Sequence, residues 1–179
     1  MEKRFETVTT YTPQMYREFS DYNMRGMLRI TRLVFLACAV LLALFTTIML
    51  MVMGNRNTLA VLLSYGLVVV FLLLPFLVEW IVKRQVETGA KEADGLVDTC
   101  AFFDEYFTEI NGDQQTTAFY PRVFKAAETA AYYYVYIDRS TAAVIAKDSF
   151  VIGDADAFRG FLNEKLGDRF TGREAAADE

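Results

Sequence analysis

Histidine is absent from this 179-residue sequence, and cysteine occurs only twice. Histidine is the commonest general base and the commonest ligand of transition metals, so its absence removes the side chain on which most hydrolytic and metal sites depend. Cys38 and Cys100 lie in segments of different character, so they predict neither a disulfide framework nor a zinc cluster. Glycine-rich phosphate loops and nucleophile elbows are also missing. We therefore expect no enzyme activity and no catalytic, cofactor-binding or metal-binding residues.

Acidic side chains are the remaining candidates for cation binding. Asp104, Glu105 and Asp113 lie near one another in the sequence, but their spacing matches no calcium-binding loop, so we expect a solvated acidic face. Asp98 and Asp104 flank Cys100, and their negative charge opposes formation of a reactive thiolate. We therefore expect Cys100 to be a thiol packed in a strand.

Charge is missing from two long segments. Residues 33–53 form an uncharged run of 21, which as a helix would span about 30 Å, the thickness of the hydrocarbon core of a bilayer. Residues 59–78 form a second uncharged run of 20, and the short polar segment 54–58 joins the two. We predict two transmembrane helices connected by an external loop, so that residues 33–78 contact the lipid bilayer. Buried helices of a soluble protein are disfavoured, because so small a domain cannot surround them.

The interior of both predicted spans contains no Asp, Glu, Lys, Arg or His. Such residues mark ion or substrate paths in transporters, so a hydrophobic anchor is the simpler interpretation. Positive charge flanks the hairpin on the side of both chain ends, and cytoplasmic flanks carry the excess of Lys and Arg. Both termini are therefore expected in the cytoplasm. The flanking cations are Arg17, Arg25, Arg29, Arg32, Lys83, Arg84 and Lys91, against Arg56 alone in the loop.

Residues 1–32 predict a short strand followed by an amphipathic helix. The segment FETVTTY alternates apolar and polar residues, and Thr12 followed by Pro13 is typical of a helix N-terminus. Two arrangements are compatible with the pattern: the helix lies on the membrane surface, or it continues into the first span. Whether the N-terminal strand joins a sheet formed by the C-terminal region is also open.

The region 84–170 predicts a small α+β domain in the cytoplasm. From residue 85 onward there are nine Lys and Arg against eighteen Asp and Glu, which disfavours both nucleic acid and anionic lipid as partners. Strand patterns alternate with turn signals and end in one amphipathic helix, a pattern typical of an antiparallel sheet capped by a helix. The expected strands cover residues 99–110, 114–120, 122–129, 132–137 and 142–147, with turns at 111–113 and 138–141 and a break at Pro121. Asp154 is expected to cap the helix and Gly167 to end it.

Four tyrosines stand in the first five positions of the strand YYYVYI, residues 132–137. Side chains alternate along a strand, so Tyr133, Val135 and Ile137 are expected to face the core. Tyr132, Tyr134 and Tyr136 are then expected on the opposite surface, with hydroxyls that reach water or cross-strand neighbours. Packing of the sheet is the preferred interpretation of this second face, and a binding surface is the alternative. The candidate interaction face consists of Tyr132, Tyr134, Tyr136 and Lys147.

The segment from Tyr132 to Leu166, preceded by two spans with a short loop, resembles the YcxB-like family of bacterial membrane proteins. An aromatic strand, a turn and an aliphatic strand that ends in Lys147 carry the resemblance, followed by Phe150 and by Phe158, Phe161 and Leu162 of the helix. Ala146 stands where the family pattern has proline. The resemblance implies a bacterial membrane protein whose C-terminal domain is pleckstrin-homology-like, and it implies no established enzymatic activity. We expect the protein in the inner membrane, with this domain in the cytoplasm.

These observations predict a two-span membrane protein whose cytoplasmic domain is a protein-interaction or regulatory module. The alternative is an accessory subunit of a membrane transporter, in which the hairpin packs against a larger permease. A protein partner and a homo-oligomer are both compatible with the sequence. Residues 171–179 are expected to be a disordered tail.

Overall fold

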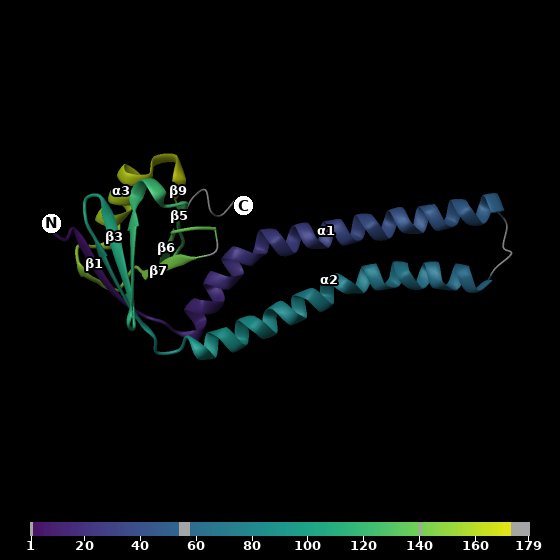
Figure 1. Ribbon diagram of the computed structural model, residues 1–179, viewed down its shortest axis with the longest axis horizontal. Coiled ribbons are helices and arrows are strands. Elements are labelled where there is room, and N and C mark those ends of the chain that lie inside the picture. The colour runs from purple at the N-terminus through teal and green to yellow at the C-terminus, as the bar shows by residue number, and fades with distance from the viewer. Residues whose placement is uncertain (1, 54–57, 140, 173–179) are drawn as a thin grey trace. The chain divides into compact units, whose positions relative to one another are not determined.

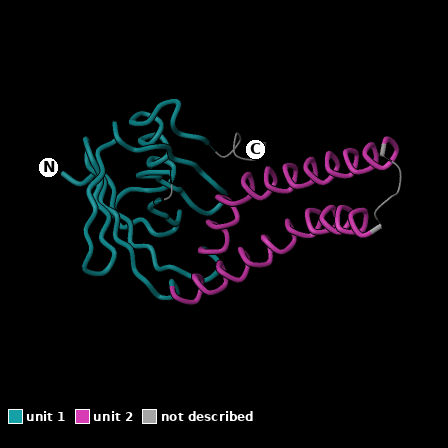
Figure 2. Tube along the Cα trace, turned by 45° about the vertical axis from the view of Figure 1, so that its right-hand side comes forward, with its two compact units in different colours: residues 1–15, 93–179 teal, residues 16–92 magenta. Residues whose placement is uncertain are grey.

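The computed structural model describes residues 2–53, 58–139 and 141–172. The chain has an α+β organisation and divides into two compact units. One unit contains residues 16–92, and the other contains residues 1–15 together with 93–179 (Figure 2). The second unit is therefore built from two stretches of chain that are separated by the whole of the first.

Two long helices form the hairpin of the first unit, α1 (Pro13–Met53) and α2 (Thr58–Glu92) (Figure 1). The Thr12 hydroxyl accepts a hydrogen bond from the Met15 backbone N–H at 3.2 Å, as expected for an N-cap. Because α1 is continuous, the N-terminal helix runs directly into the first apolar segment. The rings of Phe35 and Phe71 pack 5.9 Å apart between the two helices. Residues 54–57 of the predicted loop lie outside the described residues.

A five-stranded antiparallel sheet forms the first layer of the other unit, in the order β4-β3-β2-β1-β8. The N-terminal strand is inside it, between β2 and β8, which answers a question that the sequence left open. Phe5 faces Phe102 and Thr7 faces Cys100 in this register. The strands are β1 (Phe5–Thr10), β2 (Val97–Phe102), β3 (Tyr106–Asn111), β4 (Gln114–Phe119) and β8 (Phe150–Ile152).

A four-stranded sheet in the order β7-β6-β5-β9 forms the second layer, and helix α3 (Ala155–Leu166) follows β8. Its strands are β5 (Lys125–Glu128), β6 (Tyr132–Tyr136), β7 (Ala142–Ala146) and β9 (Phe170–Thr171). Phe158 of α3 is buried at the centre of the core. Its ring lies 4.7 Å from that of Phe102 in the first sheet and 5.3 Å from that of Tyr133 in the second. The helix therefore joins the two sheets.

Local sequence signals placed the turns and caps correctly. Asn111 and Gln114 pair across the tip of the β3–β4 hairpin, where Gly112 has a φ of 56°. The Asp154 side chain accepts a hydrogen bond from the Ala157 N–H at 2.8 Å, and Gly167 ends α3 with a φ of 54°. These features confirm the predicted hairpin turn and helix limits.

The structure departs from the expected element limits in three places. Residues 99–110 are not one strand, because a turn after Phe102 divides them into β2 and β3. Helix α2 continues to Glu92, so the second part of the sheet unit starts at residue 93 and not at 84. Charged residues begin soon after the apolar segment ends, but the helix itself continues to Glu92, because the polar residues that follow are good helix formers. Thr171 belongs to β9, and residues 173–179 of the predicted tail lie outside the described residues.

Candidate functional site

The tyrosine strand β6 has two faces, as the alternation predicts, but neither is freely exposed. Tyr133 and Val135 are buried in the core, which confirms the predicted inner face. On the second face Tyr134 is 1% exposed and Tyr136 is 2% exposed. Of the two settings expected for these phenols, water or cross-strand neighbours, burial excludes broad exposure to water. Tyr132 is half-buried, and its ring lies 6.2 Å from the ring of Tyr134 in a stacked arrangement. Alternation assigns a side chain to a face but does not determine what covers that face.

Lys147 does not lie with Tyr132, Tyr134 and Tyr136. Its position follows β7, where Ile145 faces Tyr133, so alternation places Lys147 on the Tyr133 side of the sheet. The Lys147 Nζ lies 4.9 Å from the centroid of the Tyr133 ring. The candidate interaction face is therefore divided between the two sides of one sheet.

Lys147 belongs instead to a polar cluster around Glu128, a residue that is only 4% exposed. Lys147 Nζ donates to Glu128 Oε1 at 2.6 Å, and Arg159 Nε of α3 lies 3.1 Å from Oε2. Tyr133 donates its hydroxyl proton to the Ala155 carbonyl at 2.8 Å. Burial and the nearby Glu128 carboxylate raise the pKa of Tyr133 above its ordinary value, so the phenol stays a neutral donor. This cluster holds α3 against the second sheet and is a structural element.

A second polar cluster lies on the inner face of the first sheet and includes Asp98, Cys100 and Glu109. Their carboxylate oxygens and sulfur lie within 4.8 Å of one another, so these three residues could hold a metal ion. Burial and the Asp98 carboxylate raise the pKa of Glu109. Burial and the two carboxylates also raise the pKa of the Cys100 thiol, in keeping with a packed thiol that is neutral when no cation is bound. Sequence reasoning missed the cluster, because only the strand register brings Glu109 opposite Cys100.

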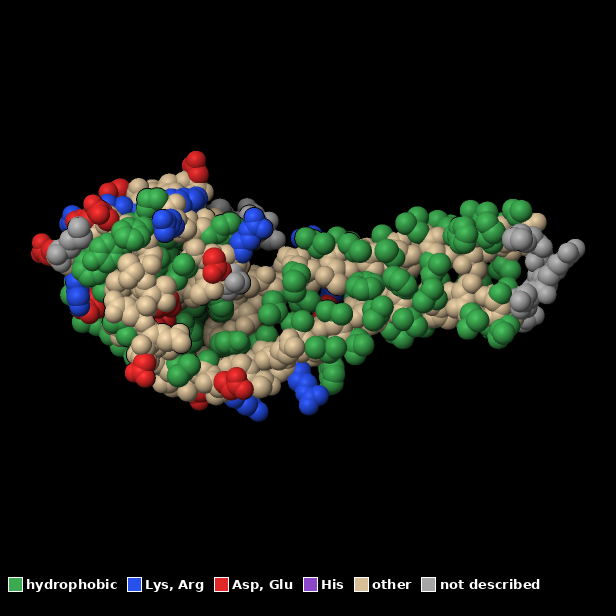
Figure 3. Space-filling model, viewed as in Figure 1, with side chains coloured by type: hydrophobic (Ala, Val, Ile, Leu, Met, Phe, Trp, Pro, Cys, Tyr) green, Lys and Arg blue, Asp and Glu red, His purple; other side chains and the backbone are tan. Residues whose placement is uncertain are grey.

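The outer face of the five-stranded sheet is largely exposed and nearly uncharged, although Ala101 on it is buried. Alternation and register assign to this face the side chains that point away from the core. Glu6 is the single charged residue among them. The other outward side chains are Val8, Thr10, Val97, Thr99, Ala101, Tyr106, Thr108, Ile110, Gln115, Thr117, Phe119 and Ile152. Over β3 and β4 the space-filling view is mostly green and tan, with charged side chains around the margin (Figure 3). A face of this kind suits a partner that contributes apolar contacts.

Strand β4 forms one edge of this face and contains no charged residue and no proline. Among the described strands it pairs only with β3, so its outer backbone groups are available. At its end Phe119 is 47% exposed, and its ring lies 5.7 Å from that of Tyr106. Folded proteins usually protect such an edge with lysine, proline or a bulge. The unprotected edge is thus the strongest candidate for recognition of another chain.

Helices α1 and α2 are long and apolar enough to cross a bilayer. Large apolar side chains along both helices are exposed, among them Leu41, Leu62 and Phe76. Trp80 is exposed near the polar end of α2, and the Arg84 guanidinium lies 5.6 Å from its ring centroid. Tryptophan beside basic residues is typical of the interface between lipid and water.

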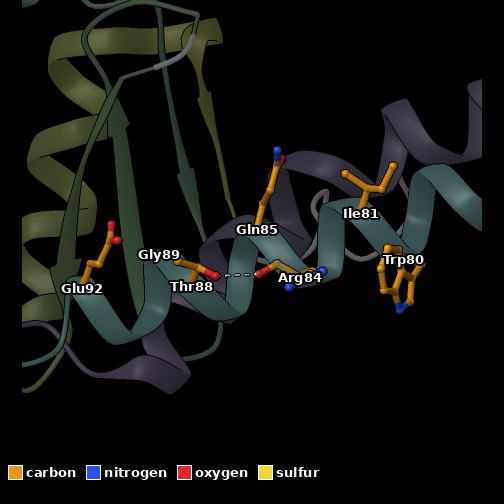
Figure 4. A pocket seen from close by; sticks show the side chains of 7 residues that line it. All are labelled: Trp80, Ile81, Arg84, Gln85, Thr88, Gly89 and Glu92. Atoms are coloured by element: carbon orange, nitrogen blue, oxygen red, sulfur yellow. Dashed lines mark hydrogen bonds between the residues drawn. The ribbon is translucent and has the colours of Figure 1, made fainter.

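Trp80 and Arg84 also line a shallow hollow along one side of α2 (Figure 4). Its seven lining residues all come from this helix, and Thr88 donates to the Arg84 carbonyl at 3.1 Å. Hydroxyls in the apolar segments are bonded within their own helix as well: Thr46 donates to the Leu42 carbonyl at 2.8 Å, and Ser64 donates to the Ala60 carbonyl at 2.9 Å. The hydroxyls of Thr46 and Ser64 are therefore satisfied within their own helices. The hollow is lined by polar and charged side chains as well as by Trp80 and Ile81.

Comparison with known families identifies the C-terminal part of the chain. Residues 102–162 match the family model of the YcxB-like proteins, from the end of β2 to α3. This part of the chain is therefore a YcxB-like domain, as the pattern of residues 132–166 predicted. No curated protein and no solved structure matches the chain.

Proposed function

We propose that this protein is a membrane-anchored interaction module, in which the unit that contains the YcxB-like domain binds a protein partner along the edge of β4. The observation that carries the proposal is the unprotected edge strand. A strand of the partner can add to such an edge through backbone hydrogen bonds, a mode of recognition known as β-augmentation. In this mode the backbone gives affinity and the alternate side chains give specificity. Phe119 and Ile110, on the outer face beside the edge, supply apolar contacts for those side chains.

The hairpin register indicates which backbone groups the partner would use. Asn111 and Gln114 flank a two-residue loop and form a hydrogen-bonded pair in such hairpins, and bonded and non-bonded pairs alternate from there. The N–H groups of Gln115, Thr117 and Phe119 then point away from β3. A proline at one of these positions removes an outward donor and leaves the pairing with β3 in place.

Charge supports a protein as the partner. Residues 85–179 carry nine Lys and Arg against eighteen Asp and Glu, so this part of the chain repels polyanions such as nucleic acid and anionic lipid surfaces. On the outer face of the five-stranded sheet, Glu6 contributes the single charge, which is negative. The proposed partner strand is therefore apolar or carries a small positive charge. We further propose that the protein has no enzyme activity of its own.

We also propose that α1 and α2 cross the inner membrane of a bacterium and that both chain ends lie in the cytoplasm. The pairing of β1 with β2 supports this topology, because strands before and after the hairpin can form one sheet only on the same side of a membrane. Basic residues at that end of the hairpin, such as Arg25, Arg29 and Lys83, favour the cytoplasmic side. Two sheets joined by α3 support the pleckstrin-homology-like arrangement that the family resemblance implies.

Site-specific photocrosslinking of the full chain in native membranes tests the proposal. A photoreactive residue at Gln115, on the β4 edge, is expected to give one discrete protein adduct. The same probe at Val151, on the opposite edge of the sheet, should not give that adduct. Thr117→Pro removes an outward N–H and should abolish the adduct, whereas Thr117→Val keeps the N–H and should preserve it.

Persistence of the adduct in Thr117→Pro, or an equal adduct from Val151, would refute binding along the β4 edge. Adducts that arise only from probes placed in α1 or α2 would favour the alternative role as an accessory subunit of a transporter. Circular dichroism of each variant establishes that the sheet is retained before the adducts are compared.

A further inference from the structure

The inner face of the five-stranded sheet holds three acidic groups without a positive charge beside them. Asp98 and Cys100 are two residues apart on β2, so their side chains share one face, and Glu109 lies opposite Cys100 on β3. Among the residues that the structure describes, no ion pair includes Asp98 or Glu109. Buried carboxylates normally have a cationic partner or bind a metal ion. This cluster therefore requires either a proton or a cation that the chain itself does not provide.

Two buried oxygen atoms at the cluster have no hydrogen-bond partner among the described residues, and they point to the cation. Asp98 is 1% exposed, and the Tyr11 hydroxyl donates to its Oδ2 at 3.4 Å while Oδ1 has no partner. Thr7 is fully buried on β1 opposite Cys100, and its Oγ1 also has no partner. The register places Thr7 directly opposite Cys100 and Asp98 two residues from it on the same face of the sheet, so both oxygens belong to side chains of the cluster. A ligand that accepts lone pairs would satisfy them.

We propose that Asp98, Cys100 and Glu109 bind a divalent transition-metal cation of the zinc type. Zinc lies about 2.3 Å from sulfur and about 2.0–2.2 Å from carboxylate oxygen, so atoms that share a tetrahedral zinc ion are roughly 3.3–3.8 Å apart. The three ligand atoms lie within 4.8 Å of one another, so they would have to approach by at most about 1.5 Å to share one such ion. Magnesium and calcium prefer oxygen ligands alone, so the sulfur of Cys100 favours zinc or a similar metal.

The position of the site explains how a chain without histidine can bind such an ion. Sulfur and carboxylate oxygen are both zinc ligands, and the strand register supplies three of them from two neighbouring strands. Glu109 is half-buried, so the site opens toward solvent on the β3 side. Bound metal would join β2 to β3 beside β1 and stabilise the sheet that contains the β4 edge, independently of whether that edge binds a partner.

Cobalt(II) titration of the purified full chain in detergent micelles tests the site, because a thiolate–cobalt bond produces a charge-transfer band. The protein is first treated with a chelator and kept under reducing conditions. We expect one equivalent of cobalt to bind with this band and zinc to displace it. Cys100→Ser should abolish the band. Cys38→Ser removes the other cysteine, in α1, and should leave the band unchanged.

Glu109→Gln is a milder variant at a half-buried position, so it keeps the proposal testable if Cys100→Ser does not fold. Loss of a residue that only orients a metal ligand costs roughly 10–100-fold in affinity, and loss of Glu109 as a ligand should cost at least that much. Absence of the band in the wild-type chain would overturn the proposal and indicate that Asp98 and Glu109 share a proton instead. A band that persists in folded Cys100→Ser, or unchanged affinity in Glu109→Gln, would also overturn it.

Discussion

Gly153→Ala should strongly destabilise the sheet unit, because two separate costs meet at this residue. Gly153 has a φ of 83°, which an L-residue with a Cβ adopts only with strain of about 1–2 kcal/mol. A Cβ at this position would also overlap the ring of Phe5. That ring cannot move freely, since it lies 5.3 Å from the ring of Phe158 and 5.1 Å from that of Phe161. Overpacking of a filled core costs about 1–3 kcal/mol, so the free energy of unfolding should fall by about 2–5 kcal/mol in total.

Hydrogen exchange of the full chain in detergent micelles, read by mass spectrometry, measures this loss. Amides of β2 and β6 report the opening of the unit, and a loss of about 2 kcal/mol or more accelerates their exchange by roughly 30-fold or more. Trp80 lies in α2, so fluorescence of the single tryptophan would not report on the sheets. Exchange in the apolar part of α1 serves as the internal reference.

Two variants separate strain from overlap. Gly112 has a φ of 56°, and no atom lies within 4 Å of a Cβ added there. Gly112→Ala should therefore lower the free energy of unfolding by the backbone strain alone, about 1–2 kcal/mol. Phe5→Val removes the ring and keeps a good strand former, so Gly153→Ala should cost less in that background by about 1–3 kcal/mol. An equal cost of Gly153→Ala in both backgrounds would show that Phe5 does not pack against Gly153, and would refute the placement of the N-terminal strand.

Three further predictions use the same exchange measurement. Phe158→Ala, at the centre of the core, should reduce the free energy of unfolding by about 3–5 kcal/mol, and a loss below about 1 kcal/mol would contradict the assigned core. Glu128→Gln leaves the ammonium of Lys147 without its carboxylate. Because that lysine is partly exposed, the loss should be about 1–3 kcal/mol, and unchanged protection of α3 would show that the cluster does not hold the helix. The hydrogen bond and the charge of Arg17 lower the pKa of Glu87 below its ordinary value of 4.5. The pair therefore stabilises the helix ends above pH 4.5 and is lost as the pH falls through the lowered pKa, so protection of residues 84–92 should decrease there in the wild type and not in Glu87→Gln.

Features that depend on a few neighbouring residues could be predicted from the sequence. Asp154 caps α3 and Gly167 ends it, because a cap and a left-handed terminal residue are determined by local backbone chemistry. The Asn111-Gly112-Asp113 turn follows the same logic. The two apolar helices were evident from the absence of charge alone.

Features that depend on strand pairing could not be predicted in the same way. β1 pairs with β2 across the whole helical hairpin, and six alternating residues carry no information about so distant a partner. The grouping of Asp98, Cys100 and Glu109 requires the β2–β3 register as well. Burial of Tyr134 illustrates a third limit, because periodicity assigns a face without stating what lies against it.

The interruption of the sheet unit by the helical hairpin sets an order of events during synthesis. β1 leaves the ribosome before its partner β2, which begins at Val97, 87 residues after the end of β1 at Thr10. At about 5–20 residues per second, the N-terminal strand waits roughly 5–20 s while both helices are made. During that interval its edges are unpaired, and four polar residues among FETVTT limit the apolar surface that it offers to other chains. The alternation that later directs Phe5 into the core thus also keeps the nascent strand soluble until the sheet can close around it.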